Sequence, residues 1–230
     1  MVWEMKVELF VQTAFQQNTR VVACERTGKA ICIDPGEASP EVVGYIRENE
    51  YDLQAIVLTH GHLDHVGGTA YLHREFPAVH ILIHEYEAPL YLSLPRQPLM
   101  MGIQPHQLAA LGMDYEDPPR PTRYLSHGEM IELGDLRFSV RHCPGHTPGH
   151  IVLAEEKEEV VFTGDCLFSG SIGRTDLPGG DYDQLIGSIR DNIMSLSDDF
   201  VIKCGHGPDT TVGHERAGNP FLTGIYKIAR

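Results

Sequence analysis

The sequence predicts a layered α/β fold, and three observations support that prediction. In the first half of the chain, short apolar stretches and helix signals alternate in the order three strands, helix, strand, helix, strand. This order is typical of domains in which helices cover a β-sheet. The second half returns to short β-stretches and then adds an amphipathic helix over residues 181–196. A hydrophobic share of 42% in 230 residues is enough for the core of one such domain, residues 1–230.

Local signals set the elements of the first half. Residues 5–11 alternate polar and apolar side chains, as a half-buried strand does. Ser39 followed by Pro40 is a typical helix start, with Ser as the cap and Pro in the first turn. Pro77 ends the second helix. We expect strands over residues 5–11, 20–25, 30–33, 52–59 and 79–83, and helices over residues 40–50 and 64–76.

The second half has a similar organisation. Leu185, Ile186, Ile189 and Ile193 recur at helical spacing in the helix of residues 181–196. The charged run at residues 155–159 is expected to be a solvated hairpin tip. Strands are expected over residues 130–133, 136–141, 151–154, 160–163 and 200–203.

Residues 95–124 interrupt this regular pattern. Six prolines break the segment, while several Leu and Met residues keep it apolar. A long irregular segment inside a compact domain is usually functional, so we interpret it as an insert that acts as a lid over a pocket. A surface excursion that packs on its own Met and Leu side chains explains the same pattern. Both interpretations stay open.

Composition and charge argue against several classes of partner. The net charge is −14 and the acidic residues are spread along the chain, which is unlike the basic face that nucleic-acid binding needs. The apolar runs are too short to span a bilayer. Residues 1–6 lack the pattern of a secretion signal. The five cysteines form no recognisable disulfide framework. We therefore expect a cytoplasmic protein that binds neither nucleic acid nor membranes.

The densest cluster of metal-binding side chains follows the apolar run at residues 55–58. The chain there reads Thr59-His60-Gly61-His62-Leu63-Asp64-His65. His60 and His62 project to the same side of an extended segment. Asp64 can begin a helix, whose N-terminus favours its negative charge. Imidazole nitrogens and carboxylate oxygens suit zinc and related divalent metals, so the cluster predicts a metal site.

Three later residues, His146, Asp165 and His206, repeat a common pattern. Each follows an apolar strand and lies beside glycine or proline, on the kind of short loop where α/β sheets place their chemistry. Each alone could be an ordinary loop residue, but together with the first cluster they indicate a shared centre. Asp34, after the third strand, is either a turn residue or a carboxylate that hydrogen-bonds near the metal site.

The motif at residues 59–65, with His146, Asp165 and His206, resembles the metallo-β-lactamase superfamily over residues 5–208. The resemblance implies an αββα sandwich of two mixed β-sheets flanked by helices. It also implies two divalent metal ions, with zinc expected and iron or manganese compatible with the same donors. His150 is implied to be structural. The implied ligands are His60, His62 and His146 for the first metal, Asp64, His65 and His206 for the second, and Asp165 bridging.

Within the superfamily, residues 164–178 and 204–208 resemble glyoxalase II (hydroxyacylglutathione hydrolase) in its short form. Because few residues follow His206 here, we expect no helical domain of the kind with which the long form grips glutathione. Arg174 stands where the long form has lysine, which makes it the candidate for binding a substrate carboxylate. Asp176 departs from the tyrosine of the long form, and how glutathione is held is therefore left open.

This resemblance implies hydrolysis of an acyl-glutathione thioester, S-D-lactoylglutathione, to D-lactate and glutathione. A hydroxide bridging the metals would be the nucleophile, oriented by Asp64 or Asp165. The alternative is a persulfide dioxygenase with one iron, which acts on glutathione persulfide and shares the segment at residues 173–176. The pattern at residues 204–208 favours the hydrolase. A scaffold that only binds a partner is a third possibility, and the oligomeric state is open.

Overall fold

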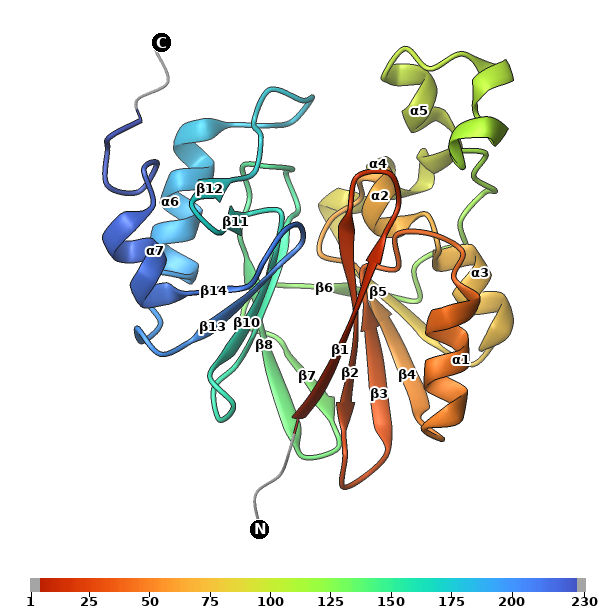
Figure 1. The fold of residues 1–230 in the computed structure, drawn as a ribbon, viewed down its shortest axis with the longest axis horizontal. Helices are drawn as coiled ribbons and strands as arrows, with labels where there is room; N and C mark the ends of the chain where they lie inside the picture. Colours follow the sequence, from red (N-terminus) through yellow and green to blue (C-terminus); the bar gives the residue numbers. More distant parts are fainter. Residues whose placement is uncertain (1–4, 227–230) are drawn as a thin grey trace. The chain divides into compact units, whose positions relative to one another are not determined.

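The computed structural model describes residues 5–226 and divides them between two compact units (Figure 1). The first unit contains the residues up to Leu125 together with Glu132–Leu136, and the second contains Ser126–Ile131 and the residues from Arg137 onward. Residues 1–4 lie outside the described residues, and they include most of the segment for which no secretion signal was predicted, residues 1–6. None of the described helices is long and apolar enough to cross a membrane.

The sheet of the first unit has the strand order β1-β2-β3-β4-β5-β6. Its strands are β1 (Met5–Gln12), β2 (Gln17–Cys24), β3 (Lys29–Ile33), β4 (Asp52–Val57), β5 (His80–His84) and β6 (Arg123–Leu125). The expected strands are all present, whereas the three-residue β6 was not anticipated because it is too short to show a period. Strands β3 and β4 run parallel. Their carboxyl ends therefore meet at one edge, which places Asp34 beside Thr59.

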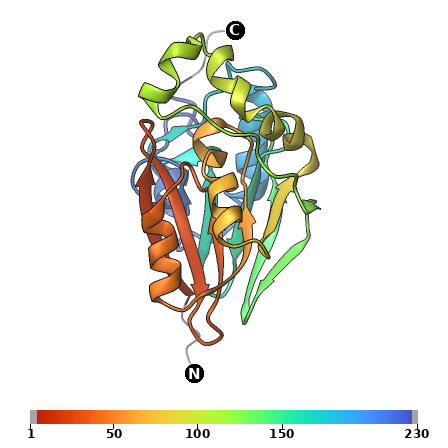
Figure 2. The same ribbon diagram turned by 90° about the vertical axis from the view of Figure 1, so that its right-hand side faces the viewer.

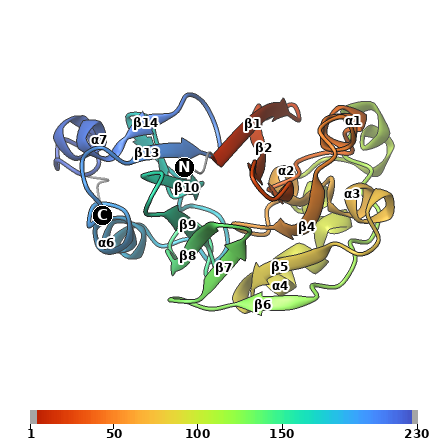
Figure 3. The ribbon, with the colours of Figure 1, turned by 90° about the horizontal axis from the view of Figure 1, so that it is seen from below.

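Helices α1 (Pro40–Glu48) and α3 (Thr69–Glu75) cover the same face of this sheet (Figures 2 and 3). The expected cap is confirmed, because the Ser39 side chain accepts a hydrogen bond of 3.2 Å from the Val42 amide. The apolar side of α1, with Val42 and Ile46, packs into the core that the strands form. The helix gains its stability mainly from this burial.

The prediction of one helix over residues 64–76 is wrong in one respect, because the segment forms two separate helices. Helix α2 (Leu63–Val66) ends at Gly67, and α3 begins after Gly68. The Gly68 amide donates to the Pro35 carbonyl at 2.8 Å, and a Cβ on Gly68 would lie 2.1 Å from the Glu37 carbonyl oxygen. Close packing of the backbone at residues 35–37 thus requires glycine here and separates α2 from α3.

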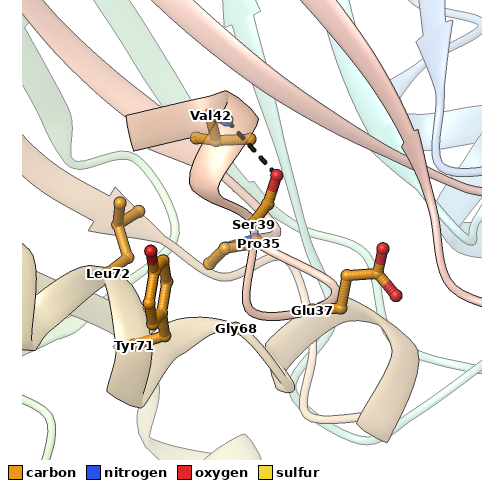
Figure 4. A pocket seen from close by; sticks show the side chains of 7 residues that line it. All are labelled: Pro35, Glu37, Ser39, Val42, Gly68, Tyr71 and Leu72. Carbon is orange, nitrogen blue, oxygen red and sulfur yellow. Dashed lines mark hydrogen bonds between the residues drawn. The ribbon is translucent and has the colours of Figure 1, made fainter. Parts of the chain in front are cut away.

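A shallow depression marks this contact (Figure 4). It is too narrow to hold a water molecule, and none of the predicted metal ligands lines it. The lining residues are Pro35, Glu37, Ser39, Val42, Gly68, Tyr71 and Leu72. We interpret the depression as a packing seam between α1 and α3 rather than as a binding site.

Residues 85–111 form a series of short helical turns. These are η1 (Glu85–Glu87), α4 (Ala88–Leu92), η2 (Leu94–Arg96), α5 (Gln97–Met100), η3 (Pro105–Gln107) and η4 (Ala109–Leu111). Proline begins or nearly begins several of them, as its fixed φ allows in a first turn. Leu99, Met100, Met101 and Leu111 are exposed, so these side chains are not packed away against one another. The lid function of residues 95–124 stays a prediction.

The second sheet has the strand order β14-β13-β10-β9-β8-β7, and a separate hairpin pairs β11 with β12. Its expected strands are confirmed. They are β7 (Met130–Leu133), β8 (Leu136–His142), β9 (Ile151–Glu155), β10 (Val160–Gly164) and β13 (Val201–Cys204). The short strands β11 (Leu167–Phe168), β12 (Ser171–Ile172) and β14 (Thr210–Thr211) add to them.

Helices α6 (Tyr182–Asn192) and α7 (Val212–Gly218) lie on one face of this second sheet (Figure 3). The Asp181 side chain caps α6 by accepting from the Gln184 amide at 2.9 Å. The apolar side of α6, including Leu185 and Ile189, joins the core with strand residues such as Val161. Helix α6 ends at Asn192, four residues before the predicted end at residue 196. Beyond it, the amides of Ile193 and Met194 both donate to the Ile189 carbonyl, which interrupts the regular helical pattern.

The prediction of a solvated tip at residues 155–159 is wrong for Glu155. This residue ends β9 and is 1% exposed. One of its carboxylate oxygens accepts hydrogen bonds of 2.8 Å from the amides of Lys157 and Glu158. The buried carboxylate therefore stabilises the turn by accepting these two backbone hydrogen bonds, which it needs once it is removed from water.

The break between α2 and α3 generates a prediction. Gly68→Ala should destabilise the protein by roughly 1–3 kcal/mol, because the new methyl group overlaps the Glu37 carbonyl. Gly44→Ala in α1 is the matched control, since a Cβ there meets nothing within 4 Å. It should stabilise the protein by about 0.5–1 kcal/mol through helix propensity. Denaturant unfolding of both variants measures the difference, and equal stabilities would contradict it.

Candidate metal centre

The first unit brings together the amino-terminal ligand group, which we define as His60, His62, Asp64 and His65. These residues lie in the loop after β4 and in the first turn of α2. The His60 ring centroid is 4.1 Å from that of His65 and 4.8 Å from that of His62. The His65 Nε2 atom lies 4.0 Å from the nearer carboxylate oxygen of Asp64. His60 and His65 are fully buried, whereas His62 and Asp64 are half-buried.

Asp34 orients two of these histidines. One of its oxygens accepts from the Thr59 amide at 2.7 Å, and the other accepts from the Thr59 hydroxyl at 2.6 Å and contacts His65 Nδ1 at 2.9 Å. Because the hydroxyl hydrogen points to Asp34, the Thr59 oxygen can accept from His60 Nδ1, 3.1 Å away. Asp34 also has a φ of 50°. It is therefore both a turn residue and a carboxylate that holds the site.

The backbone around His62 is held by two buried side chains, Glu87 and Gln97. A Glu87 oxygen accepts from the Gly61 amide at 2.8 Å. The Gln97 side chain accepts from the Leu63 amide at 2.9 Å and donates to the Gly61 carbonyl at 2.8 Å. Sequence reasoning missed both residues. An isolated Glu or Gln in an irregular segment has no period or motif, so only the contact reveals its role.

The second unit brings together the carboxy-terminal ligand group, which we define as His146, Asp165 and His206. One Asp165 oxygen lies 3.7 Å from His146 Nε2 and 3.6 Å from His206 Nε2. Both separations are too long for a hydrogen bond. Two donors that each lie about 2.1 Å from one cation are themselves roughly 3–4 Å apart. The spacing of this group therefore fits ligands of a metal ion.

His150 supports this group without belonging to it. Its Nε2 atom accepts from the Asp165 amide at 3.0 Å, and its Nδ1 atom lies 3.2 Å from Cys166 Sγ. The Cys166 thiol in turn donates to the Cys143 carbonyl at 3.3 Å. With Nε2 as an acceptor, the ring is neutral and carries its hydrogen on Nδ1. His150 therefore joins the loop that carries His146 to the loop that carries Asp165.

Arg174 approaches the ligands through its backbone. Its carbonyl accepts from His146 Nδ1 at 2.7 Å. Its exposed guanidinium forms two hydrogen bonds, of 2.7 and 2.8 Å, with the carboxylate of Asp176. The hydrogen bonds from Arg174 lower the pKa of Asp176 to about 2. The Arg174 side chain, which is expected to bind a substrate carboxylate, is thus paired with the carboxylate of Asp176 from the same chain.

Residues 13–206 match the sequence family described as the Metallo-beta-lactamase superfamily. The chain belongs to this superfamily. It is 42% identical to the hydroxyacylglutathione hydrolase GloC of Haemophilus influenzae over 95% of this chain and 98% of that protein. Among solved structures, the BLEG-1 B3 metallo-beta-lactamase is similar, with 32% identity and a TM-score of 0.83 over 95% of this chain and 100% of that one. TTHA1623 in a di-iron-bound form is also similar, with 33% identity and a TM-score of 0.81 over 94% of this chain and 100% of that one.

These similarities confirm the predicted metallo-β-lactamase fold, with two mixed sheets flanked by helices. The protein is a metal-dependent hydrolase of this superfamily, whose members bind divalent metals, typically in pairs. Candidate His and Asp ligands are present in both units.

The donor sets fit divalent cations of the superfamily. His60, His65 and His146 each direct Nδ1 to a protein oxygen, which leaves Nε2 as the atom that can bind a metal. Neutral imidazoles with carboxylates suit zinc, and they also suit iron and manganese. His60, His65 and His146 thus have the tautomer, and both groups have the donor chemistry, that a metal ion requires.

Asp34 provides a test of this orientation. Asp34→Asn places an amide NH₂ among three hydrogen-bond donors, so His65 and Thr59 lose part of their support. The affinity for divalent metal should fall by about 10–100-fold, as is usual when a residue that orients a metal ligand is changed. Competition with a chromogenic chelator measures the affinity. Asp52→Asn, at an exposed position that begins β4, is the control. Unchanged affinity in Asp34→Asn would refute the assigned role.

Proposed function

We propose that the protein hydrolyses acyl-glutathione thioesters and converts S-D-lactoylglutathione to D-lactate and glutathione. The observation that carries this proposal is the 42% identity to a hydroxyacylglutathione hydrolase, which extends over nearly the full length of both proteins. The intact set of candidate ligands supports it further. None of the five cysteines, all within the described residues, forms a disulfide, and this supports a cytoplasmic location.

The proposed centre holds two divalent cations, with zinc as the first choice and iron or manganese as compatible alternatives. His60, His62 and His146 would hold the first cation, and Asp64, His65 and His206 the second. Asp165 would bridge the two. One observation supports the bridge: a single Asp165 oxygen is nearly equidistant from His146 Nε2 and His206 Nε2, at 3.7 and 3.6 Å. Those two histidines belong to different cations in this assignment.

Divalent cations in such a centre make hydroxide available near neutral pH and polarise the thioester carbonyl. Asp64 and Asp165 are the proposed catalytic carboxylates. Each can accept the hydrogen of the attacking hydroxide and so aim its lone pair at the carbonyl carbon. The leaving thiolate has a conjugate thiol with a pKa of about 8.5, so it departs without a strong general acid. The chain therefore needs neither a serine nor a cysteine nucleophile.

Arg174 is the proposed contact for a carboxylate of glutathione. The net charge of −14 repels an anionic substrate at long range, so recognition depends on local positive charge. The ion pair between Arg174 and Asp176 is exposed on both sides, and water screens such pairs strongly. A substrate carboxylate can therefore replace Asp176 at the guanidinium.

The proposed activity predicts that zinc-loaded protein hydrolyses S-D-lactoylglutathione. The decrease in thioester absorbance measures this hydrolysis. Chelation should abolish the turnover, and restoring the metal should recover it. A metal-loaded protein that leaves a panel of acyl thioesters intact would refute the proposal. Oxygen uptake by iron-loaded protein with glutathione persulfide, without thioester turnover, would instead identify the dioxygenase activity.

The metal assignment predicts that the two cations can be lost separately. His60→Ala should chiefly empty the first site and His65→Ala the second, so each variant should retain about one metal per chain. Elemental analysis of the purified variants, with titration of the remaining site, measures this. His106→Ala, at an exposed position outside both groups, should retain the wild-type content. Loss of both metals to the same extent in either variant would count against the division.

A further inference from the structure

The hairpin formed by β11 and β12, together with the two residues that follow it, contacts every member of the carboxy-terminal ligand group. The Phe168 ring packs edge-on against the His206 ring, with centroids 5.9 Å apart. Gly173, just after β12, lies so close that a Cβ there would be 1.9 Å from the Asp165 carbonyl oxygen. The next residue, Arg174, accepts the hydrogen bond from His146 Nδ1. The position of this hairpin, and of Gly173 and Arg174 directly after it, therefore sets the surroundings of all three candidate ligands.

The tip of the hairpin is held by two buried polar side chains, one in α7 and one at its C-cap. The Gly170 amide donates to a Glu215 oxygen at 2.9 Å, and the Ser171 carbonyl accepts from the Asn219 side-chain amide at 3.1 Å. The same Asn219 nitrogen donates to Glu215 at 2.8 Å, so the two side chains also fix each other. The Thr210 hydroxyl donates to the second Glu215 oxygen at 2.6 Å. Glu215 and Asn219 are both 0% exposed.

Packing alone does not explain such a polar contact. A buried carboxylate loses its hydration, and apolar side chains of similar volume commonly hold two elements together at least as well. Hydrogen bonds add direction, because they fix the peptide groups of Gly170 and Ser171 individually. A hairpin with strands of two residues is too short to hold its own position. The hydrogen bonds from Glu215 and Asn219 at the tip, together with the close contact at Gly173, determine where the hairpin lies.

We infer that Glu215 and Asn219 are positioning residues for the metal centre. Through the hairpin, they fix the rings of His146 and His206 and the backbone of Asp165. The inference rests on the proposed function for the assignment of these three residues as metal ligands. In that assignment they serve both cations, so loosening the hairpin weakens both sites together. A change in one ligand of the amino-terminal group would weaken one site.

The test is a titration of metal-free protein with Co²⁺, in which the visible absorption and competition with a chelator are recorded in the absence of substrate. Glu215→Ala and Asn219→Ala should each weaken the binding of both Co²⁺ ions by about tenfold and alter the absorption bands. Glu215→Gln should stay close to the wild type. Its amide oxygen can accept from Gly170 and Asn219, and the Thr210 hydroxyl can turn to accept from its NH₂ group.

The matched control is His214→Ala, an exposed position on the same helix, which should bind Co²⁺ as the wild type does. Thermal unfolding of each variant separates a general loss of stability from a loss of positioning. If both alanine variants melt earlier but bind Co²⁺ with unchanged affinity and spectrum, the inference is overturned. If Glu215→Ala does not fold, Asn219→Ala and Glu215→Gln carry the same comparison. Because no substrate is used, absent thioester turnover would refute the proposed function and leave this result standing.

Discussion

The hydrogen bonds at Nδ1 of the candidate histidine ligands are the interactions on which the rest of the site depends. His60, His65 and His146 direct this atom to the Thr59 hydroxyl, the Asp34 carboxylate and the Arg174 carbonyl, at 3.1, 2.9 and 2.7 Å. Each bond selects one tautomer and one ring orientation, and it presents Nε2 to the metal position. The rings are thus ordered by folding rather than by the metal, so less ordering remains for binding.

The fold supplies those three oxygens by different routes. Parallel pairing of β3 with β4 puts Asp34 next to Thr59, which is a consequence of sheet topology. The Arg174 carbonyl reaches His146 only because Gly173 lets the backbone pack against Asp165, which is a consequence of a missing side chain. Gly205 acts similarly, since a Cβ there would lie 2.4 Å from an Asp165 oxygen. Backbone geometry in both units therefore determines the orientation of the ligands.

The sequence predicted the features that repeat locally. The longer strands, the cap at Ser39 and the candidate ligands follow from periods, turn signals and a motif with close spacing. The break at Gly67 and Gly68 was missed because it depends on the distant backbone of residues 35–37. Glu87, Gln97 and Glu215 were missed for a related reason: each is a single polar residue whose role exists only through a long-range contact. Burial of Glu155 was missed because its charged neighbours suggested solvent.

Gln97 lies within the predicted lid, residues 95–124, and connects that segment to the loop that carries the candidate ligands. It is buried and bonded to Gly61 and Leu63, so the insert is attached to the ligand loop near its start. Met113, where the helical turns end, is also buried, whereas Leu99, Met100 and Met101 between them are exposed. The lid function of residues 95–124 remains a prediction, and the two buried residues Gln97 and Met113 lie within that segment. In such a lid motion the exposed side chains of Leu99, Met100 and Met101 would move, while Gln97 keeps the backbone around His62 in place through its hydrogen bonds to Gly61 and Leu63.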